Sequence, residues 1–143
     1  MASVQKGGLA QRLDLQAGDR LIAINGHILR DVIDFHFYAA EEELELEIER
    51  GRQRLFYRVQ REYGEELGLH FTDDVFDGLR RCDNRCAFCF VDQMPPGMRH
   101  SLYVKDDDYR YSFLHGNFIT LSNWTEEDWE RVAEQHLSPL YIS

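Results

Sequence analysis

Three cysteines close together are the residues of this chain best suited to chemistry. Cys82, Cys86 and Cys89 are its only cysteines and follow the spacing C-x-x-x-C-x-x-C. A tight loop with this spacing can turn three thiolates toward one point, and soft thiolates bind iron–sulfur clusters or zinc. Ferredoxin clusters and closed zinc sites usually have four protein ligands, and there is no fourth cysteine here. The spacing therefore predicts a [4Fe–4S] cluster with one open iron.

Two other readings of the cysteines stay open. Zinc could be held by three cysteines and one histidine, because several histidines are available as the fourth ligand. The thiols could also be structural and bind nothing. Nearby arginines favour the thiolate form that a metal needs. The histidines are His70, His100 and His115, and the arginines are Arg80, Arg81 and Arg85.

Composition limits the partners and the location of the chain. It has 143 residues, of which 43% are apolar, and a formal net charge of −10. The acidic balance repels phosphate backbones, so we expect no nucleic-acid partner. No apolar run approaches the roughly 20 residues that span a bilayer, and the N-terminus lacks the apolar segment of a secretory signal. We therefore expect no membrane partner and a cytoplasmic location, where clustered cysteines are rarely disulfides.

The first half of the chain predicts a small sheet with one main helix. Asn25-Gly26 marks a hairpin turn, and Asp31 is placed to cap a helix. Glutamate alternates with apolar residues over 43–49, which is typical of a strand with one buried and one solvated face. Arginines of the returning strand, Arg54, Arg58 and Arg61, could lie opposite these glutamates. The expected elements are a helical turn at 8–13, strands at 19–24, 43–49 and 55–59, and a helix at 31–40.

The string Ala17-Gly18-Asp19-Arg20-Leu21-Ile22-Ala23-Ile24-Asn25-Gly26 resembles the core of a bacterial PDZ-like domain. The resemblance covers about residues 4–71 and implies capture of an extended protein or peptide partner at a sheet edge. The nearest counterpart of the loop that binds a terminal carboxylate is 64–71. Because Glu65 and Glu66 would oppose a carboxylate there, we expect structural docking or an intramolecular role in preference to peptide capture.

The second half predicts alternating strands and helices. A strand over 75–81 leads into Cys82, and a loop follows. The pattern then predicts a strand at 118–122, a helix that Thr125 caps and that runs to about His136, and a strand at 140–142. This order is the opening of a β/α layer or barrel. Because a barrel needs about 200 residues or more, we expect only its truncated beginning. The predicted domains are 1–71 and 72–143, in a mixed α+β and α/β fold.

The cysteine motif resembles the signature of radical S-adenosylmethionine enzymes, including the aromatic Phe88 before the third cysteine. The resemblance implies that Cys82, Cys86 and Cys89 hold three irons and that S-adenosylmethionine binds the fourth. It extends over 88–99, 101–110 and 116–118 to a bacterial and cyanobacterial family labelled FeS-containing oxidoreductases. Members of that family join a PDZ-like domain, a radical S-adenosylmethionine-like segment and a C-terminal domain of unknown function.

The resemblance also suggests cofactor-binding residues. Many radical S-adenosylmethionine enzymes hold the cofactor's amino group with a Gly-Gly-Glu type segment, and here the corresponding stretch is 120–123. Ser122 and Asn123 are the candidates to replace it, beside Phe88. Asp92 and Gln93 are candidates for contacts behind the cluster. The acidic run 105–108 is predicted to be a solvated loop.

The sequence therefore predicts a radical S-adenosylmethionine oxidoreductase fragment, with its substrate unidentified. The alternative is a non-catalytic iron–sulfur or zinc-binding module, with redox sensing or protein interaction as its role and the PDZ-like domain for docking.

Overall fold

The computed structural model describes residues 1–143 and divides them into two compact units, Met1–Asp77 and Gly78–Ser143. We refer to these as the first and the second unit. The division falls between residues 77 and 78, whereas the sequence placed it between 71 and 72. The tail of the first unit, 72–77, stays with it because Phe76 N donates to Arg30 O and Val32 N donates to Asp74 O.

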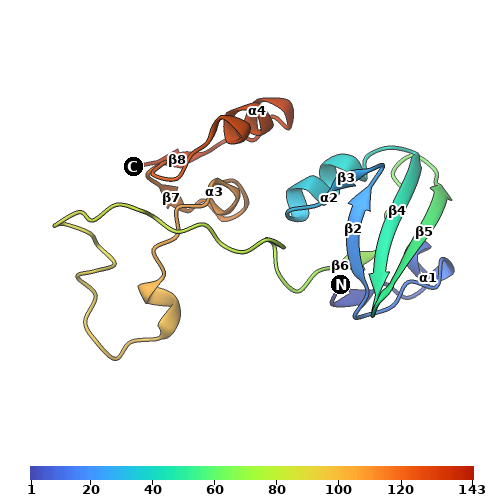
Figure 1. The fold of residues 1–143 in the computed structure, drawn as a ribbon, viewed down its shortest axis with the longest axis horizontal. Coiled ribbons are helices and arrows are strands. Elements are labelled where there is room, and N and C mark those ends of the chain that lie inside the picture. The colour runs from blue at the N-terminus through green and yellow to red at the C-terminus, as the bar shows by residue number, and fades with distance from the viewer. The chain divides into compact units, whose positions relative to one another are not determined.

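The first unit is built on a four-stranded antiparallel sheet with the order β3-β2-β4-β5 (Figure 1). Its strands are β2 (Arg20–Ile24), β3 (His27–Ile28), β4 (Glu43–Arg50) and β5 (Gln53–Gln60). The alternation in β4 buries its apolar side chains and leaves the glutamates on the other face, as the sequence predicted. Arg58 lies opposite Glu45 and pairs with it, and Arg54 pairs with Glu47. Arg61 instead donates to the backbone carbonyls of Ala39, Glu41 and Glu65.

Two helices and a small second sheet complete the first unit. α1 (Leu9–Arg12) and α2 (Val32–Tyr38) match the predicted helical turn and helix. β1 (Ser3–Val4) pairs antiparallel with β6 (Leu69–His70), which ties the two ends of the unit together. Leu21, Ile24, Leu44, Leu46, Ile48, Leu67 and Leu69 belong to the core between these elements.

The second unit contains a β-α-β element. β7 (Phe118–Ile119) and β8 (Tyr141–Ile142) pair in parallel and are joined through α4 (Glu126–Glu134). Thr125 and Asp128 form a capping box at the start of α4, and Trp124 packs on Trp129 at 4.8 Å between ring centroids. The cap at Thr125 follows the sequence prediction. A parallel pair with a helical crossover is the repeating unit of β/α folds.

Other parts of the second unit differ from the prediction. Residues 75–81 form no strand, because Val75 and Arg81 each make only an isolated bridge, to Asp31 and Asp106. The strand predicted at 118–122 ends at Ile119. A 3-10 helix, η1 (His100–Tyr103), and a helix, α3 (Tyr109–His115), were not predicted. The observed fold is a mixed α/β arrangement of small sheets, and no helix in it is long and apolar enough to cross a membrane.

Mutation of Asp31 tests how much its helix cap stabilises the first unit. Its side chain is fully buried and accepts from Ile33 N at 3.0 Å and Asp34 N at 2.9 Å, which caps α2. We expect Asp31→Ala to lower the free energy of unfolding by about 2 kcal/mol, while Asp31→Asn, which keeps an acceptor, loses clearly less. Urea unfolding followed by far-UV circular dichroism measures the loss.

A matched control lies within the same molecule. Both tryptophans, Trp124 and Trp129, belong to the second unit, so their fluorescence follows that unit alone. The tryptophan transition should stay in place in Asp31→Ala. Equal losses in the alanine and asparagine variants would contradict the capping role.

Candidate functional site

Cys82 lies in a cradle of hydroxyl groups. Its backbone N donates to Lys105 O at 2.9 Å, which fixes the start of the cysteine loop. Its Sγ lies 3.5 Å from Thr120 Oγ1 and 3.6 Å from Ser122 Oγ, on the segment that follows β7. Asp83 N donates to Ser122 Oγ at 3.0 Å. The first ligand position of the motif is therefore held by two elements distant in sequence.

Asp107 accepts hydrogen bonds from both hydroxyl groups of this cradle. It is 2% exposed, and its carboxylate accepts from the backbone N and the hydroxyl of both Thr120 and Ser122. Burial by itself would raise the pKa of Asp107, but these hydrogen bonds outweigh burial and lower it. The prediction of a solvated acidic loop at 105–108 is thus wrong for Asp107 and Asp108, because both carboxylates are buried among partners.

The hydroxyl contacts also act on the thiol. Burial raises the pKa of Cys82, but the contacts with Thr120 and Ser122 and the backbone of Asn84 outweigh it and lower the pKa below its ordinary value. A lowered pKa favours the thiolate, which is the form that binds metals and acts as a nucleophile.

The other two cysteines lie on a loop without helix or strand. Cys89 N donates to Cys86 O at 3.0 Å, and both thiols are partly exposed and free of disulfides. Lys105 contacts the Cys89 thiol with its side chain and forms an ion pair with Asp92. Asp92 also contacts Cys89, and its hydrogen bond from Lys105 lowers its pKa. Lys105 therefore binds Cys82 through its backbone and Cys89 through its side chain.

A buried ionic network fixes the segment that leads into the motif. Asp108 is fully buried, accepts from Arg110 Nε at 2.8 Å and Nη2 at 2.6 Å, and also accepts from Arg80 N at 3.0 Å. The Arg110 guanidinium reaches Gly78 O at 2.9 Å. Arg80 pairs with Asp128 of α4 at 2.7 Å. These contacts hold residues 78–81 in place although they form no strand.

The residues predicted to bind S-adenosylmethionine lie in different surroundings. Ser122 uses its hydroxyl within the cradle of Cys82. Asn123 Nδ2 donates to Arg81 O at 2.8 Å. Phe88 is 81% exposed, and its neighbour in the loop, Phe90, is 78% exposed. Ser122 and Asn123 thus brace the cysteine loop, and sequence reasoning missed Asp107 and Thr120, which act with them.

In the structure, no group of three or more histidine, cysteine or carboxylate side chains lies close enough together to hold a metal ion. Cys82, Cys86 and Cys89 are all reduced, partly exposed and carried by one short loop, so the donor set itself suits an iron–sulfur cluster. Metal sites are commonly completed only when the ion binds and orders its ligands. The donors therefore fit an iron–sulfur cluster by their chemical type, and the structure does not gather them around one point.

The first unit has a groove beside the loop predicted to bind a carboxylate. It measures about 360 Å³ and lies between α2 and the 66–71 segment, with Phe35, His36, Leu67, Gly68 and Leu69 among its lining residues. Glu65, expected to oppose a carboxylate, forms an ion pair with Arg12. Arg61 also lines the groove, and its guanidinium is bonded to backbone carbonyls.

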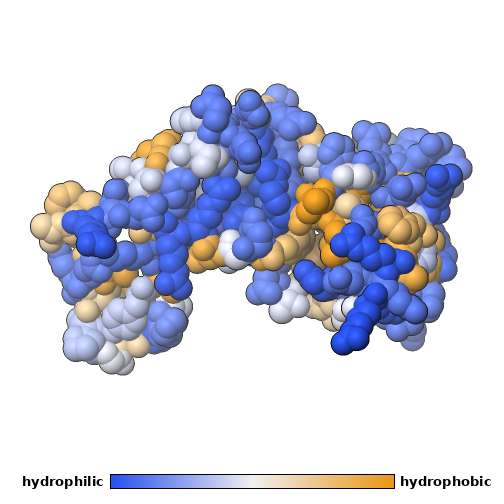
Figure 2. All heavy atoms as spheres, viewed as in Figure 1, coloured by the Kyte–Doolittle hydropathy of each residue, from blue (hydrophilic) through white to orange (hydrophobic).

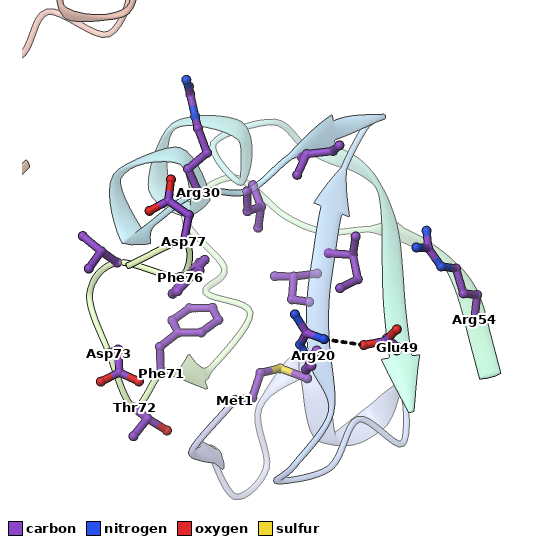
Figure 3. A pocket seen from close by; sticks show the side chains of 15 residues that line it. Met1, Arg20, Arg30, Glu49, Arg54, Phe71, Thr72, Asp73, Phe76 and Asp77 are labelled. Carbon is purple, nitrogen blue, oxygen red and sulfur yellow. Dashed lines mark hydrogen bonds and ion pairs between the residues drawn. The ribbon is translucent and has the colours of Figure 1, made fainter. Parts of the chain in front are cut away.

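A second hollow of about 540 Å³ lies beside β2 and β3 of the same unit. Phe71 and Phe76 point into it from the 71–77 segment, and Arg20 is paired with Glu49 at its margin (Figure 3). Hydrophobic residues gather over this part of the first unit, among hydrophilic ones (Figure 2). Because Arg20, Arg30 and Arg54 each pair with a carboxylate of this unit, the margin offers a ligand no clear charge preference.

Comparison with known families also finds two parts in the chain, with other boundaries than the two units. A family model described as a Radical SAM-like domain matches residues 61–143, and a PDZ domain model matches residues 1–50. No curated protein and no solved structure matches the chain. The chain thus combines two kinds of domain, with the cysteine motif in the second.

The buried carboxylates of the second unit predict a stability that depends on pH. Burial raises the pKa of Asp128, but its partners Arg80 and Thr125 lower it below the ordinary 3.8. A lowered pKa means that the stability is present above the unfolded value and is lost as the pH falls through the folded value. At pH 7 we expect Asp128→Asn to cost about 3 kcal/mol, and near pH 3 clearly less.

Tryptophan fluorescence during urea unfolding at the two pH values measures this difference for the second unit. Glu127→Gln, an exposed change in the same turn of α4, should have little effect at either pH. A cost of Asp128→Asn that is the same at both pH values would contradict the ion-pair explanation.

Proposed function

The chain belongs to the Radical SAM-like domain family, and on that premise we propose that it forms part of a radical S-adenosylmethionine oxidoreductase. Cys82, Cys86 and Cys89 would hold a [4Fe–4S] cluster and leave one iron open to the cofactor. The observation that supports this most directly is the arrangement at Cys82, whose thiol has a lowered pKa inside a braced loop. Residues 78–143 would form the beginning of a β/α barrel, of which β7–α4–β8 is one repeat.

The protein residues have distinct tasks in this proposal. When bound, the cluster and S-adenosylmethionine supply one-electron cleavage of a carbon–sulfur bond and removal of a substrate hydrogen atom. Asp107, Thr120 and Ser122 fix Cys82, and Lys105 joins both ends of the motif. Asn123, whose Nδ2 donates to Arg81 O, would accept from the cofactor's amino group through its side-chain oxygen. Phe88, which is 81% exposed beside the third cysteine, would contact the bound cofactor.

Electron paramagnetic resonance of the anaerobically reconstituted, reduced protein tests this function. We expect a [4Fe–4S] signal that changes on addition of S-adenosylmethionine and is lost in Cys86→Ala. Phe90→Ala, in the same loop, keeps all three thiols and should keep the signal. A cluster signal indifferent to the cofactor would favour the sensor alternative. Zinc uptake without iron uptake would favour the interaction module.

A second proposal concerns the PDZ domain, because its groove gives it a specific surface. We propose that the groove between α2 and 66–71 binds an extended segment of a protein partner. Charge at the groove does not favour a terminal carboxylate, because Glu66 and Asp74 line it beside one guanidinium, that of Arg61. We therefore expect a basic or internal segment of the partner there in preference to a free C-terminus.

A peptide array with free or amidated C-termini tests the groove. We expect the protein to retain amidated peptides at least as well as the same peptides with a free carboxylate. Glu66→Lys reverses a charge at the groove and should weaken the binding of basic peptides by about tenfold, while Glu43→Gln on β4 should not. Retention of free-carboxylate peptides alone would contradict this charge preference, and retention of no peptide would contradict the groove as a binding site.

A further inference from the structure

Asp107 and the sulfur of Cys82 share the same two hydroxyl groups. Ser122 Oγ is 2.5 Å from Asp107 Oδ2 and 3.6 Å from Cys82 Sγ. Thr120 Oγ1 is 3.0 Å from Asp107 Oδ2 and 3.5 Å from Cys82 Sγ. Each hydroxyl stands between a carboxylate and a thiol, so its hydrogen has two possible acceptors.

The number of hydrogens decides the arrangement. A hydroxyl has one hydrogen to donate, and an ionised carboxylate is a stronger acceptor than sulfur. The shorter distances to Asp107 agree with donation to the carboxylate. While Cys82 is protonated, both hydroxyl oxygens then present lone pairs to it, and its single S–H hydrogen can be donated to either of them. Once the sulfur is a thiolate, it competes with Asp107 for the hydroxyl hydrogens, and this is how the two contacts lower its pKa. The backbone N of Asn84 is a donor to the sulfur that does not depend on Asp107.

We propose that Asp107 is a positioning residue that controls hydrogen bonding at the sulfur of Cys82. By accepting hydrogen bonds from the hydroxyl groups of Thr120 and Ser122, its carboxylate competes with the sulfur for these donors. Asp107 is fixed for this task, because it is buried and also accepts from the backbone N of both residues.

The consequence for iron rests on the proposed function. Hydrogen bonds to cluster sulfurs and nearby positive charge make an iron–sulfur cluster easier to reduce. Asp107 weakens two hydrogen bonds to Cys82 by competing for their hydrogens, and it places a buried negative charge behind the sulfur. Cys82 should therefore hold its iron as an electron-rich ligand, in a cluster with a low reduction potential.

The S–H stretching vibration of Cys82 tests the proposal without any metal. In the Cys86→Ala/Cys89→Ala background only one thiol remains, and infrared spectroscopy reads its frequency. We expect Asp107→Asn to raise the frequency, because the hydroxyl hydrogens turn to the sulfur and S–H loses its acceptors. Asp106→Asn removes a charge one residue away, at a side chain that contacts Asn117, and should leave the frequency unchanged.

Another variant keeps the test decisive if Asp107→Asn fails to fold. Thr120→Val/Ser122→Ala retains the carboxylate but removes both acceptors of S–H, so the frequency should again rise. Tryptophan fluorescence confirms that the second unit of each variant is folded. An unchanged frequency in the folded variants, or an equal rise in Asp106→Asn, would overturn the proposal.

The reduction potential of the reconstituted cluster gives the second readout. Redox titration followed by electron paramagnetic resonance should show a more positive potential in Asp107→Asn, and a clearly smaller shift in Asp106→Asn. Equal shifts would overturn the role of the hydroxyls, because any nearby charge would then suffice. Failure of the unmodified protein to take up a cluster would overturn the proposed function, while the S–H frequency would still decide the role of Asp107.

Discussion

Two adjacent buried aspartates, Asp107 and Asp108, impose the constraint on which the second unit depends. A buried charge costs several kcal/mol unless it is paired and hydrogen-bonded, so each carboxylate must bring its partners to it. Asp108 accepts hydrogen bonds from Arg110 and from the backbone of Arg80, and Asp107 accepts them from the segment that follows β7. Three stretches with little regular structure are thereby joined. The geometry at Cys82 results from this requirement.

The same constraint divides the cysteine motif into a fixed part and an adaptable part. Cys82 is held by Lys105 and by the hydroxyl cradle, whereas Cys86 and Cys89 lie on turns outside any helix or strand. Phe88 and Phe90 on those turns expose most of their side chains to solvent. On the proposed function, this loop, anchored at one end, would close around the metal without rebuilding the unit, and metal binding would supply the free energy of ordering.

Sequence reasoning succeeded where the signal was local. The alternation over 43–49, the hairpin at Asn25-Gly26 and the capping role of Asp31 each depend on neighbours within a few residues. It failed where partners are distant. The run 105–108 looked solvated because Thr120 and Ser122, which satisfy Asp107, are more than ten residues away. The helix α3 was missed although Asp108 caps it and Gly116 ends it with a φ of 75°.

The two ends of the motif meet different charges. Behind Cys82 lies the buried carboxylate of Asp107, which opposes added negative charge. Beside Cys89 lies the ammonium of Lys105, whose charge is offset by its ion pair with Asp92. Because a buried charge is weakly screened by salt, the carboxylate behind Cys82 acts more strongly than the more exposed ion pair beside Cys89. Lys105 also contacts Cys82 through its carbonyl, so one residue fixes the spacing of the two ends.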